Sequence, residues 1–211
     1  NGVKVWEVNL GTQNLVQIEV LFHGGRLDEH KKGVARATAR LMKEGTKSFS
    51  GSEIAEHVDF YGANISTGAS LDYSYLKVFS LNRFFKNVLP YLEEVLFYPS
   101  FPESELQKYK DNSIQRLQLE AVKSELVAYK ILTERLYGTE HPYGYNSNEE
   151  IYDKLTREDL IAYHKATFGA ENCNVVISGK ITPDVKKAVF NLFSKLEKKK
   201  FAFQYNDPEV I

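Results

Sequence analysis

The sequence predicts an α+β fold in which a mostly antiparallel sheet has its helices packed on one side. Two observations lead to this prediction. Segments with the two-residue hydrophobic period of strands come in adjacent pairs, which is typical of antiparallel hairpins. Segments with the 3.6-residue period of helices are gathered into blocks. The regular alternation of single strands and helices that marks a doubly wound parallel sheet is not seen.

Five segments are predicted to be strands. Residues 3–8 and 16–22 are separated by a short turn, and we expect them to pair antiparallel. Residues 63–70 and 72–81 form a second pair, and residues 174–178 are an apolar strand near the end of the chain. In the second strand, four apolar residues share one face: Val16, Ile18, Val20 and Phe22. In the fourth, a more polar set shares a face: Tyr73, Tyr75, Lys77 and Phe79.

Seven helices are predicted from apolar stripes and capping residues. Gly45 ends the first of them, and either Ser50 or Ser52 caps the second. Pro90 lies inside the third and is expected to kink or loosen it. Thr156 caps the sixth helix with an acidic residue at its third position. The predicted helices cover residues 33–44, 51–61, 82–98, 103–121, 124–137, 157–167 and 183–200.

The chain length and charge limit the classes of protein to consider. The 211 residues are enough for one domain with a substantial core, which we assign to residues 1–205. Residues 206–211 form no predicted element and could begin a linker. The formal net charge of -1 gives no electrostatic reason to expect nucleic acid or an anionic membrane as a partner. No apolar run approaches the roughly 18 residues of a membrane span.

The chain has one cysteine, Cys173, in the apolar run of the last predicted strand. We expect it to be a small buried hydrophobic residue, since buried cysteines are seldom reactive. One cysteine also excludes an internal disulfide framework. Together with the lack of a recognisable leader, this favours a cytoplasmic location, with the periplasm as the alternative.

The five histidines do not form a metal-binding motif. A zinc site needs three or four His, Cys or carboxylate ligands that converge on the metal. The nearest approach is a segment with Glu53, Glu56 and His57, in which Glu53 and His57 share a helix face. We interpret this segment as a solvated polar face. His141, beside a proline in a turn, and His164, on a helix with charged neighbours, are interpreted as structural.

Motifs for other enzyme classes are also missing from the sequence. It contains no Gly-x-Ser-x-Gly nucleophile elbow and no phosphate-binding Gly-x-x-x-x-Gly-Lys loop. The first predicted helix carries basic residues on the face opposite its apolar stripe, which by itself is typical of a solvated surface. These residues are Lys32, Arg36, Arg40 and Lys43. Motifs alone therefore do not indicate an enzyme.

A series of short segments has an order and spacing that cover essentially the whole chain. They begin with the first strand and with Gly24-Gly25-Arg26, and they continue at residues 33–35, 41–46, 60–63, 98–101, 136–144 and 172–179. In this order they resemble the landmarks of the insulinase, or pitrilysin, family of zinc peptidases, which includes the mitochondrial processing peptidase. The resemblance implies the family's clamshell-type domain, and the chain is similar to the first domain of that arrangement.

Active members of that family carry His-x-x-Glu-His on the first helix, where both histidines bind zinc and the Glu activates water. A third ligand, also Glu, follows on a later helix. Carried over by this resemblance, the two histidine positions are Arg36 and Arg40, and the general base is Ala39. The third ligand falls on Arg116, or on Gln115 if the alignment shifts by one residue. Every position departs from the active pattern.

These replacements cannot perform the family's chemistry. A guanidinium group stays protonated and has no lone pair to offer a metal ion. Ala39 has no group that could deprotonate water. We therefore expect no catalytic residue and no cofactor in this chain, with zinc only in a partner subunit, and we expect the chain to be inactive by itself.

The resemblance implies a role as the non-catalytic half of a peptidase assembly. In two-subunit members of the family, one subunit holds zinc while its partner has a degenerate motif and helps to enclose the peptide. The expected partners are a zinc-bearing homologous subunit, a second homologous domain and a peptide substrate. Arg36 and Arg40 would then face the peptide chamber and favour carboxylate groups, unless their charge reflects drift at a released metal site.

Two other functions are compatible with the sequence. The first is a structural or scaffolding protein on the same fold, similar to the family's respiratory-complex core proteins. The second is an active metallopeptidase that uses unmatched residues such as Glu53, Glu56 and His57, although no complete ligand set can be named for it.

Overall fold

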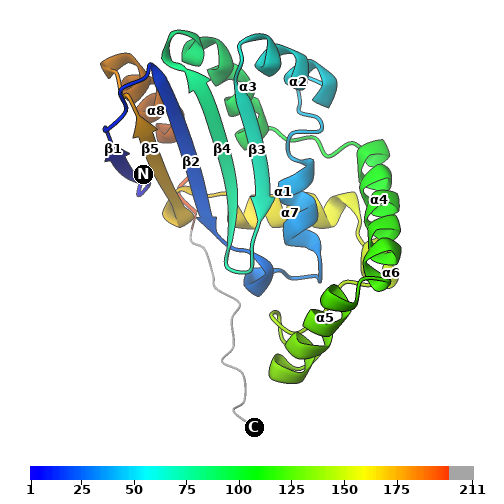
Figure 1. Cartoon of the computed structure of the whole chain (residues 1–211). Helices are drawn as coiled ribbons and strands as arrows, with labels where there is room; N and C mark the ends of the chain where they lie inside the picture. The colour runs from blue at the N-terminus through cyan, green and yellow to red at the C-terminus, as the bar shows by residue number, and fades with distance from the viewer. Residues whose placement is uncertain (200–211) are drawn as a thin grey trace.

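The centre of the fold is β2 (Leu15–His23), the strand with the clearest hydrophobic alternation. The computed structural model describes residues 1–199 and places β2 in a five-stranded sheet with the order β1-β5-β2-β4-β3 (Figure 1). β2 pairs antiparallel with β4 (Tyr73–Leu81) and with β5 (Cys173–Gly179). β3 (Asn64–Ala69) pairs antiparallel with β4 and forms one edge. The sheet is mostly antiparallel, which confirms the predicted fold class.

One predicted strand pairing is wrong. β1 (Lys4–Val8) does not pair with β2, because β5 lies between them and β1 runs parallel to β5. The connection between β1 and β2 passes the end of β5, where the Gly11 N–H donates to the Gly179 carbonyl at 3.0 Å. A side chain on Gly11 would meet the Gly179 backbone at 2.4 Å, so this close approach requires glycine. Consecutive strands are neighbours only roughly two-thirds of the time, and no local signal shows a distant strand inserted between them.

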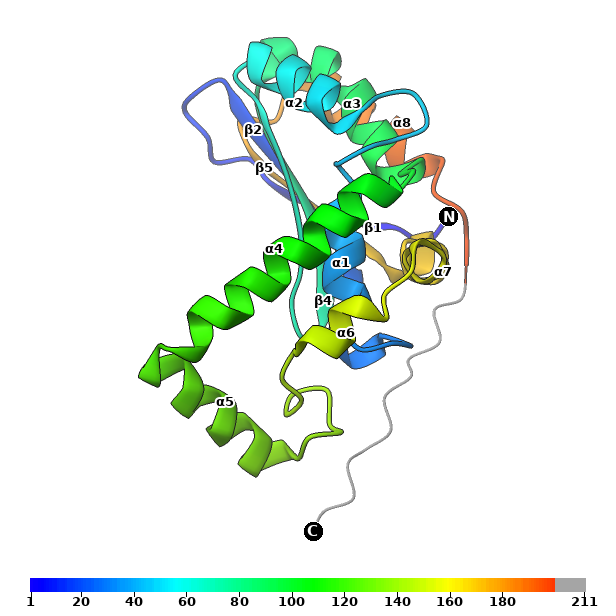
Figure 2. The same cartoon turned by 90° about the vertical axis from the view of Figure 1, so that its right-hand side faces the viewer.

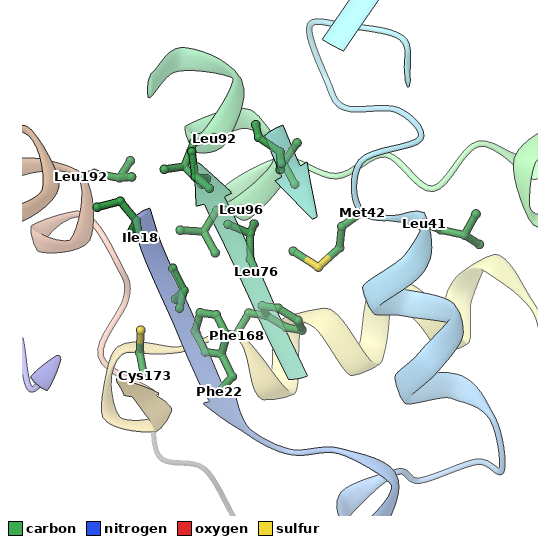
Figure 3. Packing of buried hydrophobic residues seen from close by; sticks show 14 of the residues in the cluster. Ile18, Phe22, Leu41, Met42, Leu76, Leu92, Leu96, Phe168, Cys173 and Leu192 are labelled. Carbon is green, nitrogen blue, oxygen red and sulfur yellow. The ribbon is translucent and has the colours of Figure 1, made fainter. Parts of the chain in front are cut away.

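The core lies between the sheet and the helices on one of its faces. α3 (Phe85–Phe97), α7 (Arg157–Thr167) and α8 (Pro183–Ser194) cover this face (Figure 1). The Phe22 ring of β2 packs against the Phe168 ring at the end of α7, with 4.6 Å between ring centroids (Figure 3). The predicted inward face of β2 is fully buried: Val16, Ile18, Val20 and Phe22. Each such side chain stabilises the fold by about 1.5–3 kcal/mol.

Further helices lie along the β3 edge of the sheet. α1 (Val34–Leu41) packs against β3 and α7, and α4 (Glu103–Ala121) packs against α1 and α6 (Glu149–Asp153). Figure 2 shows α4 passing this edge, with α5 (Ser124–Tyr137) at its far end, on the side of the sheet opposite α3 and α8. These helices therefore extend the domain beyond the layer that covers the core.

Capping residues set the starts of two helices as the sequence predicts. Ser50, not Ser52, caps α2 (Gly51–Phe60). The Glu53 N–H donates to Ser50 Oγ at 3.3 Å, and the Ser50 N–H donates to the Glu53 carboxylate at 2.8 Å. Thr156 caps α7 through the same pair of hydrogen bonds with Asp159. A cap of this kind stabilises the protein by about 1 kcal/mol.

The extent of several helices differs from the prediction. α1 ends at Leu41 instead of residue 44, and α8 ends at Ser194 instead of near residue 200. Pro90 lies inside α3, which is assigned as one helix from Phe85 to Phe97. α6 was not predicted, because a helix of five residues has too few positions to show a hydrophobic period.

The predicted linker at residues 206–211, and residues 200–205 before it, lie outside the described residues. Within residues 1–199, no helix combines the length and the apolar character needed to cross a membrane.

Cys173 and His164 are both packed into the structure, as predicted. Cys173 is buried, and its burial raises the pKa of the thiol. The Nε2 atom of His164 lies 3.1 Å from the Leu96 carbonyl, and its ring stacks on Phe168 with 4.7 Å between centroids. Burial lowers the pKa of His164 to about 4, and the charges of Lys199 and Lys165 act in the same direction. His164 is therefore neutral at pH 7.

Acid should destabilise the domain partly through His164. Its folded-state pKa of about 4 lies below the ordinary value of 6.5, so the neutral ring stabilises the fold above pH 6.5. This contribution is lost as the pH falls toward 4, and we expect it to amount to about 1–3 kcal/mol. Urea denaturation measures the free energy of unfolding across this pH range. Between pH 6.5 and pH 4 this free energy should fall less steeply for His164→Gln than for the wild type. An equal dependence of the free energy of unfolding on pH in the wild type and in His164→Gln would contradict a lowered pKa of His164.

Candidate functional site

Helix α1 carries three of the positions that the sequence analysis singled out. It begins after Gly33, whose φ of 88° favours glycine, and the Ala35 N–H donates to Glu29 Oε2 at 3.2 Å. Six of its eight residues are buried, and the other two are Arg36 and Arg40. Packing on the remaining sides therefore fixes the direction in which these two side chains leave the helix.

Arg36 and Arg40 line a cavity of about 600 Å³ between α1, the edge strand β3 and α4. Arg116 on α4 lines the same cavity. The structure thus brings together three predicted positions from two helices that are far apart in the sequence. The charged residues of the lining are four basic and two acidic side chains: Arg36, Arg40, Lys108, Arg116, Glu44 and Glu105.

The other two predicted positions do not line this cavity. Ala39, at the position of the general base, is packed inside the domain and is 1% exposed. Gln115, the alternative third position, is exposed but absent from the cavity wall. Of the two candidates for the third position, only Arg116 faces the site.

The basic stripe predicted for the first helix is divided in the structure. Only Arg36 and Arg40 belong to α1, since the helix begins at Val34 and ends at Leu41. Lys32 precedes the helix and forms an ion pair with Glu140 at 3.0 Å. Lys43 follows it and lines a separate pocket beside α2. The expected four-residue face is therefore wrong, because the helix is shorter than its sequence pattern.

The arginines of the cavity are poorly paired. Within the part of the chain that the structure describes, Arg36 and Arg40 make no hydrogen bond or ion pair. Arg116 Nη2 lies 3.5 Å from Ser113 Oγ, the long limit for a hydrogen bond. Lys108 is paired with Glu105 at 2.8 Å. The cavity therefore presents unneutralised positive charge, which attracts anionic groups.

Tyr109 lies beside these cations and borders the cavity. Its hydroxyl is buried without a hydrogen-bond partner of normal geometry, although Ser113 lies nearby. Burial, with a smaller contribution from Tyr152, raises the pKa of Tyr109 to about 12, while the charges of Arg36 and Arg116 oppose this. Tyr109 therefore stays protonated and adds a neutral hydroxyl to the cavity wall.

The side chains of the cavity do not fit zinc. Within residues 1–199, no three His, Cys, Asp or Glu side chains are grouped so that they could hold a metal ion. Guanidinium groups cannot coordinate the ion. In the alternative segment, the helix cap occupies Glu53, and the Ser50 N–H bond lowers the pKa of this carboxyl. His57 Nδ1 lies 2.7 Å from the Glu53 carbonyl, and its ring stacks on Tyr91. Glu56 does not join Glu53 and His57 in a group that could hold a metal ion, as far as residues 1–199 are described.

Comparison with known families establishes the lineage of the chain. The family model described as insulinase (peptidase family M16) matches residues 4–144, which is more than half of the chain. The chain belongs to the insulinase family of peptidases. A second model, described as the peptidase M16 inactive domain, matches residues 154–211. The family resemblance found in the sequence is thereby confirmed.

Individual relatives support the assignment of this chain to the insulinase family. The uncharacterized zinc protease YmxG of Bacillus subtilis is 26% identical over 215 residues, which cover 99% of this chain and 52% of YmxG. The crystal structure of a peptidase M16 inactive domain from Pseudomonas fluorescens has a TM-score of 0.89 and 25% identity, covering 98% of this chain and 52% of that one. A protease from Helicobacter pylori shares the fold, with a TM-score of 0.86, 18% identity and coverages of 99% and 52%. The chain spans about half the length of these relatives.

Sequence reasoning missed three residues near the site. Tyr75 lines the cavity that contains Arg36, Arg40 and Arg116, which we call the cationic cavity. Arg26 lines a smaller neighbouring cavity, and the Tyr145 ring stacks on Arg26. Arg26 appeared only as part of a glycine-rich family landmark. The positions of the two tyrosines depend on contacts between distant segments, so no local signal could have identified them.

Removal of one cavity charge should not destabilise the fold. Arg36 and Arg40 are like charges at i,i+4 without an ion-pair partner, an arrangement that costs about 0.2–0.5 kcal/mol. Arg36→Gln should therefore raise the free energy of unfolding by about that amount at low salt and by less at high salt. Urea denaturation at both salt levels measures this. Lys187→Gln on the exposed face of α8 is the control and should show neither effect. A loss of more than about 1 kcal/mol on Arg36→Gln would mean that Arg36 has a structural role.

Proposed function

We propose that this chain is a non-catalytic domain of an insulinase-type zinc peptidase assembly. In this role it helps to enclose and bind a peptide next to a homologous subunit that carries the zinc. The observation that supports the proposal is that one cationic cavity is lined by Arg36, Arg40 and Arg116, the positions that the family resemblance assigns to the zinc ligands. Guanidinium groups at these three positions can bind an oxygen-rich group, but they have no lone pair for a metal and cannot act as a base toward water.

The sheet edge beside the cavity supports binding of an extended peptide. β3 is an edge strand, and its residues Thr67, Gly68 and Ala69 line the cavity. An edge strand offers backbone N–H and C=O groups to which an extended chain can add. The Tyr75 ring lies over Gly68, where a side chain would meet the Tyr75 hydroxyl at 2.5 Å. An extended peptide at this edge could therefore contact both the backbone groups of β3 and the guanidinium groups of the cavity.

The arm formed by the end of α4 and by α5 supports the presence of a partner domain. α5 buries none of its residues, which is unusual for a helix rich in large apolar side chains. Seven large apolar residues of this arm are between 48% and 82% exposed: Leu119, Val122, Tyr129, Ile131, Leu132, Leu136 and Tyr137. Apolar surface gathered in this way is typical of an interface with another protein. We propose that the second homologous domain or the zinc-bearing subunit covers it.

A scaffolding protein on the same fold is the alternative function, and the apolar arm suits it equally well. The two functions differ in what the cationic cavity does, because a scaffold does not need it. For location we propose the cytoplasm, with the periplasm as the alternative, since the lone Cys173 is a free buried thiol. Fractionation of the source cells tests this.

Cleavage by a reconstituted pair tests the proposed function. A family member from the same source with an intact His-x-x-Glu-His motif should cleave peptides efficiently only when this chain is added. Arg36→Ala combined with Arg40→Ala should raise KM for acidic peptides about tenfold or more, with kcat little changed. This follows because a charge-assisted hydrogen bond contributes about 1.5–3 kcal/mol to binding.

The matched control for this experiment is Lys32→Ala combined with Lys43→Ala, which removes the same charge outside the cavity. It should leave KM unchanged. Unchanged cleavage by the Arg36 and Arg40 double variant would remove the cavity from substrate binding. Full activity of the zinc-bearing subunit without this chain would favour the scaffold.

Zinc binding tests the assignment of the degenerate positions. The wild-type chain should purify without stoichiometric zinc. The variant Arg36→His, Arg40→His and Arg116→Glu should bind about one zinc ion, because it supplies two imidazoles and a carboxylate around one cavity. Elemental analysis and calorimetric titration measure this. The control variant replaces Arg116→Glu with Gln115→Glu and should bind no zinc, since Gln115 does not line the cavity. Equal zinc binding by both variants would contradict the assignment.

A further inference from the structure

A second, smaller cavity lies next to the cationic one. It measures about 210 Å³ and shares Arg36, Ala69 and Tyr109 with its larger neighbour. Arg26 and Tyr145 also line it. Its size is below that of a site for a whole drug-sized ligand, so it suits the end group of a longer molecule that lies in the larger cavity.

Arg26 borders this smaller cavity and has a buried pair of donors without partners in the described part of the chain. Its Nε and Nη2 atoms are buried and have no hydrogen-bond partner within residues 1–199. The two nitrogens share one edge of the guanidinium plane, and this edge can donate two parallel hydrogen bonds to the two oxygens of a carboxylate. A buried charged donor without a partner is costly, and a bound anion would remove that cost.

Arg157 shows how a purely structural arginine is used in the same chain. Its Nε donates to the Phe101 carbonyl at 3.0 Å, and its Nη2 donates to the Ser100 carbonyl at 2.8 Å. The same edge of the guanidinium group is therefore filled by backbone carbonyls of a loop. Arg26 differs because its corresponding edge lacks such partners while its side chain lines a cavity.

The Arg26 side chain is held in position. Its Cζ atom lies 3.4 Å from the centroid of the Tyr145 ring, and its backbone N–H donates to the Ser70 carbonyl at 3.2 Å. The Tyr145 hydroxyl is fixed in turn, since it donates to Glu29 and accepts from the Gly33 N–H at 3.1 Å. The donor edge is thus preorganised, which lowers the cost of binding.

The carboxylate already present does not occupy this donor edge. Glu29 lines the same cavity, but its oxygens accept from the Tyr145 hydroxyl and from the Ala35 N–H at 3.2 Å. No hydrogen bond joins Glu29 to the two free nitrogens of Arg26. Burial raises the pKa of Glu29, against the hydrogen bond from Tyr145. Arg26 and Arg36 together outweigh its single negative charge.

We propose that Arg26 binds a peptide carboxylate in this cavity, through parallel hydrogen bonds from Nε and Nη2, with Arg36 as a second cation at the border. The peptide nature of the ligand rests on the proposed function, whereas the carboxylate follows from the donor geometry. The carboxylate comes either from the C-terminus of the peptide or from an Asp or Glu side chain. In either case the smaller cavity selects peptides that carry an acidic group, and the rest of the peptide lies in the larger cavity.

Titration of the purified chain with three versions of one short peptide tests this proposal. The first has neutral side chains and a free C-terminus, the second is the same peptide amidated, and the third is amidated and carries one Glu. The Arg26 Nε–H resonance, assigned by its loss in Arg26→Lys, reports on the site. We expect it to shift with the first or the third peptide, which identifies the source of the carboxylate, and not with the second.

Two variants add a measurement of affinity. Arg26→Lys keeps the charge but loses the two-donor edge, and it should weaken binding of the acidic peptide about tenfold or more. Lys43→Gln removes a cation that lines neither cavity, and it should leave the affinity unchanged. Thermal unfolding checks that Arg26→Lys is folded. If it is not, comparison of the free and amidated peptides on the wild-type chain still decides the question.

Three results would overturn the proposal: no shift of the Arg26 resonance with any peptide, an equal shift with the amidated neutral peptide, or equal weakening by Arg26→Lys and Lys43→Gln. The outcome is separate from that of the proposed function. Failure of partner-dependent cleavage would remove the peptidase role but leave carboxylate binding by the isolated chain as measured.

Discussion

The enclosure of α1 is the constraint on which the rest of the structure depends. The helix is packed against β3, β4, α4 and α7, and six of its eight residues are buried. Ala35, Ala37 and Ala39 allow its backbone to lie close to these neighbours, since larger side chains would overpack the contact. A helix enclosed in this way exposes one narrow stripe. In this sequence the stripe holds Arg36 and Arg40, so packing of the core decides what the cavity contains.

The same enclosure explains why the cavity is electropositive. The two arginines cannot turn to another face of α1, and α4 adds Arg116 and Lys108 from the opposite wall. Of these four cations, Lys108 has a carboxylate partner at 2.8 Å. Like charges crowded without partners work against stability, and such clusters are typical of sites kept for binding. The smaller cavity repeats this arrangement with Arg26, whose stacking on Tyr145 supplies contact but no hydrogen bond to its free edge.

The sequence predicted the features that depend on local chemistry. The bounds of the helix at residues 103–121 agree with α4, and Thr156 with Asp159 marks the start of α7, because apolar stripes and caps are encoded within a few residues. The insertion of β5 between β1 and β2 was missed, since it joins segments at opposite ends of the chain. The residues proposed as degenerate ligand positions came from the family resemblance. Arg26 could not be proposed from the sequence. Its interest comes from two side-chain nitrogens that find no hydrogen-bond partner among residues 1–199, and only the folded structure shows this.

The character of the cavity argues against simple drift of a released metal site. In an active relative, as the resemblance implies, a zinc ion would stand here and attract carbonyl or carboxylate oxygens. Guanidinium groups attract the same oxygens but cannot hold a metal or activate water. On the proposed assignment, the replacements at Arg36, Arg40 and Arg116 remove bond breaking while keeping the sign of the charge. Independent drift at three positions on two helices has no physical reason to keep that sign each time. Selection for binding the oxygen atoms of a peptide would keep a positive charge at each position.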